Sequence, residues 1–227
     1  MLLQIVSMLW EDLFLDNTHA RWTFALALCL AIAATMLGLF AAGDNVFAAD
    51  VSIAQWSQQW QGGLPDALER LGDMLGYTPT AIVVLVGGAV ISALLRAWQR
   101  SAFFIVTGML RLAGMVLKPI FESPRPDPNL VQLPSHAHGF GYPSGHSMTA
   151  AMIATIVVMI ARDVSISRHY RWLITGLAIV VAVLVGWSRV WSGAHWPTDV
   201  IGGWSYGVAI VLLAWAITRI PAGLRTD

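Results

Sequence analysis

The chain has 227 residues, of which 57% are hydrophobic and 11% are charged, and its formal net charge at pH 7 is zero. Soluble domains carry roughly 25% charged residues, so the composition argues against an ordinary soluble protein and indicates one surrounded mostly by lipid. A net charge of zero gives no bulk attraction to nucleic acid, and we expect no nucleic-acid partner.

The N-terminal residues do not have the pattern of a cleaved signal peptide. Such a peptide begins with a short basic stretch, whereas this chain has Glu11, Asp12 and Asp16 ahead of its first long apolar run. Leu2–Trp10 is instead expected to lie along the membrane interface as a short amphipathic helix.

Six apolar stretches approach the roughly 20 residues that a helix needs to cross a bilayer. In chain order they are Thr23–Ala42, Thr80–Leu95, Ser101–Ile120, Ser147–Ala161, Trp172–Trp187 and Val200–Ile217. The predicted fold class is therefore all-α, a six-helix transmembrane bundle in which residues 1–227 form a single membrane-embedded domain. An even number of spans places both termini on the same side.

Residues 44–79, between the first two spans, are too polar to cross a membrane. Their apolar residues recur at intervals of three and four, which predicts short amphipathic helices on the membrane interface. Gly62, Gly63 and Pro65 predict a break in the middle. The segment either lines the path of a lipid to the site or packs on the helix ends as a loop.

Arginine and lysine residues near span ends collect on the cytoplasmic side of membrane proteins. One side here holds Arg21, Arg96, Arg100, Arg162, Arg168, Arg171, Arg219 and Arg225, and the other holds Arg70, Lys118, Arg125 and Arg189. Three of the last four belong to the motifs described below, which give them another reason for their position. We therefore expect cytoplasmic termini and motifs on the extracytoplasmic, periplasmic side.

Two features inside the spans also carry predictions. Gly203 and Gly207 are spaced for close helix packing of the last span. Arg111 is costly in lipid unless it faces the bundle or water. It is expected to be structural, to pair with an acid such as Asp73, or to help hold a substrate.

Three short segments carry the chemistry, and the first contains Lys118 and Arg125. A guanidinium can bind two phosphate oxygens at once, and an ammonium adds a point charge. Taken alone, this pair is equally typical of cations that anchor a helix end at the interface.

The second segment, Pro143-Ser144-Gly145-His146, precedes the fourth span. Unpaired backbone N–H groups and the positive end of the helix dipole make such a position an anion site. Gly145 lets the backbone approach an anion closely, and the Ser144 hydroxyl either donates to a phosphate oxygen or caps the helix. His146 follows directly.

The third segment places Arg189 six residues before His195, and Asp199 four residues after it. Within one helical turn Asp199 can accept the Nδ1 proton of His195 and leave Nε2 free as a nucleophile. Pro197 suits the first turn of the last span. A purely structural hydrogen-bonded pair is the alternative.

The three segments together match one family pattern: Lys, six residues, Arg-Pro; then Pro-Ser-Gly-His; then Ser-Arg, five residues, His, three residues, Asp. The matching positions are Lys118, Arg125, Pro126, Pro143, Ser144, Gly145, His146, Ser188, Arg189, His195 and Asp199. The chain therefore resembles the type-2 phosphatidic acid phosphatase superfamily of lipid phosphate phosphatases, which share a site with vanadium haloperoxidases.

The resemblance implies a double displacement on a lipid phosphate in the membrane. It implies that His195, oriented by Asp199, attacks phosphorus, while His146 protonates the leaving oxygen and later activates water. The phosphate-binding set is Lys118, Arg125, Ser144, Gly145 and Arg189. No metal and no cofactor is expected, although His136 and His138 with the two site histidines make zinc the chemical rival.

Three functions remain open from the sequence. The first is a phosphatase whose substrate is a lipid phosphate such as undecaprenyl pyrophosphate, phosphatidic acid or phosphatidylglycerol phosphate. The second is transfer of the phosphoryl group to another lipid. The third is non-catalytic binding or transport of a lipid phosphate, against which the intact histidines argue. The sequence makes no prediction of the oligomeric state.

Overall fold

The computed structural model describes residues 17–43, 46–133 and 138–219. The predicted interfacial helix Leu2–Trp10 lies outside these ranges, as do Asp44, His136 and Arg225. Every regular element in the described ranges is helical. In chain order they are α2 (Asn17–Ala41), α3 (Ala48–Ser57), α4 (Gly63–Gly76), α5 (Thr78–Leu94), α6 (Trp98–Ala113), the 3-10 helix η1 (Gly114–Val116), α7 (Leu117–Phe121), α8 (Gly145–Asp163), α9 (Arg168–Trp191) and α10 (Pro197–Arg219).

Five helical stretches are long and apolar enough to cross a membrane. They are Arg21–Ala41, Trp98–Phe121, Gly145–Asp163, Arg168–Trp191 and Pro197–Arg219. α5 has 17 residues and makes a sixth candidate only together with α4, from which it is bent by 43°. The predicted all-α membrane bundle is confirmed, and five to six candidates agree with the six spans predicted.

The polar segment between the first two spans forms α3 and α4, with the break at Gly62, where φ is +113°. Glycine adopts such a backbone conformation with little strain. The two short helices predicted for this segment are therefore present.

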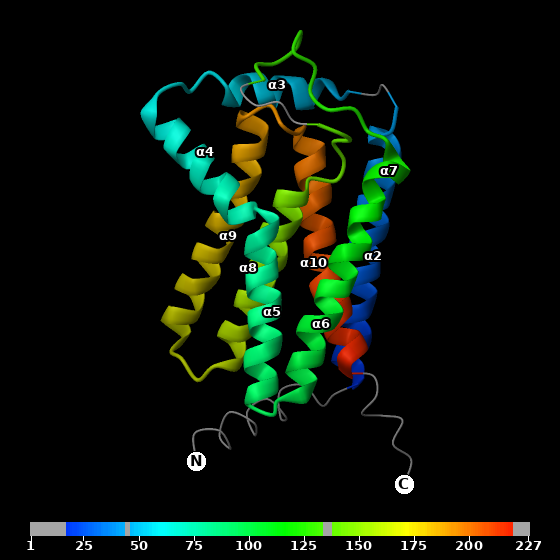
Figure 1. Cartoon of the computed structure of the whole chain (residues 1–227), viewed down its shortest axis with the longest axis vertical. Coiled ribbons are helices and arrows are strands. Elements are labelled where there is room, and N and C mark those ends of the chain that lie inside the picture. Colours follow the sequence, from blue (N-terminus) through cyan, green and yellow to red (C-terminus); the bar gives the residue numbers. More distant parts are fainter. Residues whose placement is uncertain (1–16, 44–45, 134–137, 220–227) are drawn as a thin grey trace.

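α10 is the central helix of the bundle. It packs against α2, α8 and α6, while α8 also packs against α9, and α5 against α6. Figure 1 shows the long helices side by side along the long axis, with α3 lying across one end and α7 at the same end. We call this the α3 end. α2 begins and α10 ends at the opposite end of the bundle.

Close packing of α10 on α8 depends on two glycines. A Cβ atom on Gly203 would lie 2.5 Å from the carbonyl oxygen of Ser144, and one on Gly207 would lie 2.4 Å from that of Met148. Both distances are too short for real contacts, and the opposing atoms are backbone. The predicted close packing is thus confirmed, and it brings the start of α10 beside the start of α8.

Gly207→Ala is expected to lower the stability of the folded protein by about 1–3 kcal/mol, because helix α8 must shift to admit the methyl group. The matched control is Gly176→Ala on α9, where the new Cβ meets open space and higher helix propensity adds up to about 1 kcal/mol. Thermal unfolding in detergent measures both. Equal midpoints for the two variants would contradict the packing argument.

Candidate active site

The predicted site residues come from four parts of the chain that meet toward the α3 end. They lie on α7 and the loop after it, at the start of α8, near the end of α9, and just before or within the first turn of α10. In that order they are Lys118 and Arg125; Ser144, Gly145 and His146; Arg189; and His195 and Asp199.

His195 and Asp199 form a buried pair. His195 Nδ1 lies 3.1 Å from Asp199 Oδ2, and the same oxygen accepts the backbone N–H of Trp196 at 3.0 Å. His195 is 4% exposed and Asp199 is fully buried. Pro197 opens α10 between them, so the proline begins the helix. With Nδ1 held by the carboxylate, Nε2 is the nitrogen left for chemistry.

The pKa of His195 lies well below its ordinary value of 6.5. Loss of solvation on burial is the main cause, and the positive charges of Lys118, Arg125 and Arg189 add to it. His195 is therefore neutral at physiological pH, which is the form that can act as a nucleophile.

We expect the acidic limb of the kcat/KM profile to fall below pH 6.5, because activity requires the neutral imidazole and rises with pH through the pKa of His195. Phosphate release measured from about pH 4 to 9 with kinetics at low substrate tests this. An acidic limb centred above about pH 7 would contradict the assignment of His195 as the nucleophile.

Arg125 and Lys118 tie the loop before α8 to this pair. Arg125 Nη1 lies 3.5 Å from His195 Nε2, and Arg125 Nε donates to the carbonyl oxygen of Gly139 at 3.0 Å. Lys118 Nζ donates to the carbonyl oxygen of Phe140 at 2.9 Å. The guanidinium thus sits beside the nitrogen that would attack phosphorus.

Ser144 is the N-cap of α8. Its Oγ accepts the backbone N–H of Ser147 at 3.5 Å, and its own N–H donates to the carbonyl oxygen of Asp199 at 3.0 Å. The predicted capping role is confirmed, and the fully buried Ser144 links the starts of α8 and α10. Contact of its hydroxyl with a phosphate stays a prediction.

Arg189 pairs with two acids that the sequence reasoning did not assign to the site. Its Nη2 lies 2.8 Å from Glu69 Oε1 and its Nη1 lies 2.7 Å from Asp73 Oδ1, both on α4. Asp73 Oδ1 also lies 3.2 Å from His146 Nε2. The signal available in the sequence was the i, i+4 spacing of two acids on an amphipathic helix.

Of the three alternatives open for Arg111, pairing with Asp73 is not found, and the contacts are those of a structural arginine. Arg111 is buried, and its Nη2 donates to the carbonyl oxygen of Gly145 at 3.3 Å and to Thr149 Oγ1 at 3.4 Å. Asp73 is taken by Arg189 and His146. Arg111 thus faces the bundle, and its guanidinium stabilises the start of α8 through these two hydrogen bonds.

Asp50 on α3 is a third acid that the sequence reasoning did not place. Its carboxylate accepts the backbone N–H of Thr198 at 3.0 Å and the Thr198 hydroxyl at 2.6 Å. Burial raises the pKa of Asp50, and these hydrogen bonds act in the opposite direction. α3 therefore holds the first turn of α10, which carries Asp199.

The zinc alternative depended on a cluster of histidines. The carbonyl oxygen of His138 accepts Arg125 Nε at 3.2 Å, while His136 is outside the described ranges. Within residues 17–43, 46–133 and 138–219, no group of three or more His, Cys, Asp or Glu side chains could hold a metal ion.

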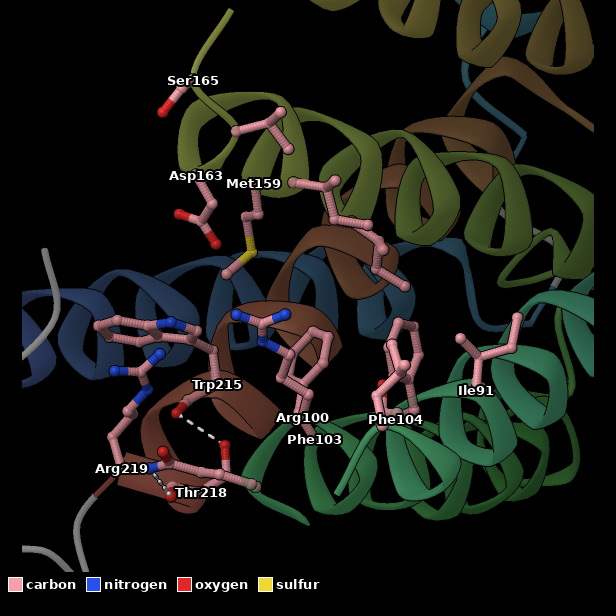
Figure 2. A pocket seen from close by; sticks show the side chains of 16 residues that line it. Ile91, Arg100, Phe103, Phe104, Met159, Asp163, Ser165, Trp215, Thr218 and Arg219 are labelled. Carbon is pink, nitrogen blue, oxygen red and sulfur yellow. Dashed lines mark hydrogen bonds between the residues drawn. The ribbon is translucent and has the colours of Figure 1, made fainter. Parts of the chain in front are cut away.

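A cavity of about 390 Å³ lies at the other end of the bundle and contains none of the predicted site residues. Figure 2 shows Phe103 and Phe104 from α6, Trp215 and Arg219 from α10, and Asp163 from α8 around it. The candidate site is therefore separate from this apolar cavity.

Comparison with known proteins matches the profile of the PAP2 superfamily to residues 98–220. This region holds all eight predicted site residues. The chain belongs to the PAP2 superfamily. The predicted enzyme class, a membrane lipid phosphatase, is confirmed at this level.

Several PAP2 proteins are similar to the chain over long regions. Phosphatidylglycerophosphatase B of Bacillus subtilis is 32% identical over 69% of this chain and 74% of its own length. The crystal structure of a transmembrane PAP2 type phosphatidylglycerolphosphate phosphatase from Bacillus subtilis has a TM-score of 0.69 at 27% identity, covering 88% of this chain and 98% of its own.

Two further proteins match more weakly. An undecaprenyl-diphosphatase of Sulfolobus acidocaldarius is 39% identical, but over 33% of this chain and 32% of its own length. The crystal structure of Aquifex aeolicus LpxE shares the fold, with a TM-score of 0.57 at 24% identity over 74% of this chain and 95% of its own.

Proposed function

We propose that this PAP2 protein hydrolyses lipid phosphate monoesters or diphosphates through a phosphohistidine on His195, without a metal. The observation that carries the proposal is the buried His195–Asp199 pair, in which Nε2 of His195 lies 3.5 Å from Nη1 of Arg125. A neutral imidazole beside a fixed cation is suited to attack on an anionic phosphoryl group.

In the first half-reaction His195 Nε2 attacks phosphorus and forms a P–N bond. The bond from phosphorus to the leaving oxygen breaks, and His146 gives that oxygen its proton. Charge on the transferring group is balanced by phosphate ligands from all three motifs. These ligands are Lys118, Arg125, Ser144, Arg189 and the N–H of Gly145.

In the second half-reaction a water molecule attacks the phosphohistidine. His146, now neutral, takes a proton from that water, the P–N bond breaks, and His195 recovers its neutral form. The two histidines therefore begin each cycle in opposite protonation states, which predicts a bell-shaped pH profile.

For the substrate we propose phosphatidylglycerol phosphate first, followed by phosphatidic acid and undecaprenyl pyrophosphate. Phosphatidylglycerol phosphate comes first because two Bacillus subtilis proteins are named as phosphatases of this lipid. One of them is similar to the chain in sequence and the other in structure. All three lipids present a terminal phosphate to the same cations.

We further propose that residues 1–227 act as one membrane-embedded domain, with the motifs of residues 118–199 and the segment 44–79 on the extracytoplasmic side and both termini in the cytoplasm. The arginine bias supports this orientation. Two of the arginines assigned to the inner side, Arg96 after α5 and Arg168 at the start of α9, lie on connections or helix ends away from the α3 end.

The test is phosphate release by the purified protein in detergent with EDTA, using the three lipids in parallel. Acid-quenched and alkali-quenched samples are then examined for protein-bound phosphate, because a phosphohistidine is lost in acid and survives alkali. The proposal expects release in EDTA together with an acid-labile phosphoprotein.

Each alternative gives a different result. If phosphate is released only after a divalent metal is added, the reaction depends on a metal site and the proposed mechanism is wrong. Phosphorylated acceptor lipid in place of free phosphate would indicate a phosphotransferase. Binding of the lipids without release or transfer would indicate a non-catalytic binder.

A further inference from the structure

Two carboxylates of α4 form ion pairs with charged groups of the site. Glu69 and Asp73, four residues apart, contact the two terminal nitrogens of Arg189 at 2.8 and 2.7 Å. The Asp73 oxygen that contacts Arg189 also lies 3.2 Å from His146 Nε2. One carboxylate thus bridges a phosphate-binding cation and the histidine proposed as the acid.

Close packing of its backbone against neighbouring helices holds α4 beside the site. A Cβ atom on Gly72 would lie 2.5 Å from Ser188 Oγ, and one on Gly76 would lie 2.8 Å from His146 Cβ. Both glycines are buried. The α4 backbone therefore lies directly against α9 and α8, and the acidic side chains start from a fixed position.

The same contacts fix the plane of the Arg189 guanidinium. Its Nε donates to Ser188 Oγ at 3.2 Å and its Nη2 donates to Glu69 Oε1 at 2.8 Å, while Nη1 forms an ion pair with Asp73. Arg189 is buried, so this orientation is held within the protein.

His146 faces charges of both signs. Burial acts most strongly against its protonated form, and Arg189, Lys118 and a charged His195 act in the same direction, whereas Asp73 is the group that acts in its favour. An opposite charge within about 4–6 Å favours the charged form of a group. Since the proposed mechanism needs His146 to start protonated, its site requires a nearby negative charge.

We propose that Asp73 is a positioning residue whose negative charge keeps His146 protonated as the general acid, while Glu69 anchors Arg189. Each histidine then has its own aspartate, and the two aspartates act in opposite ways, because Asp199 orients a neutral nucleophile whereas Asp73 sustains a charged acid. The inference rests on the proposed function, because it gives a role to a histidine that only this mechanism requires.

The test compares two leaving groups in the variant Asp73→Asn. A lipid phosphate monoester expels an alkoxide and needs the proton, whereas p-nitrophenyl phosphate expels a phenolate that leaves without it. We expect kcat for the lipid to fall by about 100-fold and kcat for p-nitrophenyl phosphate by less than about threefold. The basic limb of the lipid pH profile should also move to lower pH.

Two variants on the same helix complete the experiment. Asp66→Asn removes a carboxylate from the first turn of α4 and should leave both activities unchanged. Glu69→Gln should raise KM for both substrates, because it loosens Arg189, without discriminating between the leaving groups. Thermal unfolding in detergent checks that each variant folds.

Three outcomes would overturn the inference. Equal loss on both substrates would make Asp73 merely structural. A lower KM with faster turnover in Asp73→Asn would show that the carboxylate competes with phosphate for Arg189. Absence of turnover in the unmodified protein would remove the proposed function and this inference with it, whereas the first two results leave the proposed function intact.

Discussion

His195→Ala is expected to abolish phosphate release, with kcat lower by about 10⁴-fold or more. The side chain removed is the proposed nucleophile, so the P–N bond of the intermediate cannot form. His146 is required in its charged form, and the nearest cation, Arg125, has no lone pair to donate. The acid-labile phosphoprotein should disappear with the activity.

The matched control for this variant is His169→Ala. His169 is exposed in the first turn of α9, at the other end of that helix from Arg189, so the same substitution should leave kcat and KM unchanged. Initial rates under saturating lipid, with unfolding midpoints for both variants, give the comparison. A His195→Ala protein that keeps a tenth of the parental kcat would exclude the phosphohistidine mechanism.

Asp199→Asn is expected to lower kcat by about 10⁴-fold while nearly preserving the shape of the site. Asp199 Oδ2 lies 3.1 Å from His195 Nδ1 and accepts the N–H of Trp196 at 3.0 Å. An asparagine oxygen in this place can still accept both N–H groups, but the side chain lacks the negative charge that stabilises the imidazole as it becomes positive during attack.

Asp50→Asn separates this effect from general damage to the start of α10. Asp50 also holds that turn, through the N–H and hydroxyl of Thr198, but the ion pairs of His146 and His195 are with Asp73 and Asp199. We expect a lower unfolding midpoint for Asp50→Asn and a kcat within about threefold of the parent. An Asp199→Asn protein that behaves in the same way would show that Asp199 is structural.

The sequence predicted the spans because the signal for them is local. A bilayer core demands about 20 consecutive apolar residues, and stretches such as Thr23–Ala42 can be recognised without knowing their neighbours. The capping of α8 by Ser144 is likewise a local property, because the cap and the helix belong to one segment. The close packing at Gly203 and Gly207 could be predicted because two glycines four residues apart on a helix allow another backbone to approach. The membership of the PAP2 superfamily followed from side-chain chemistry at fixed spacing.

The contacts between distant segments could not be predicted in this way. Pairing with Asp73 was one of three alternatives that the sequence left open for Arg111. In the tertiary structure Asp73 contacts Arg189 and His146, and Arg111 donates to the carbonyl oxygen of Gly145. The ion pairs of Asp73 depend on where α4 packs in the bundle, and the spacing of residues in the sequence does not predict that position.

The sequence by itself determined the membrane class, the helical bundle and the residues of the three motifs, because composition, apolar length and motif spacing are one-dimensional properties. The tertiary structure alone decided that α4 and α3 bring Glu69, Asp73 and Asp50 to the site. Their side chains act on residues more than 70 positions away in the chain, and such contacts are fixed by how glycines and helix ends let the segments approach in space.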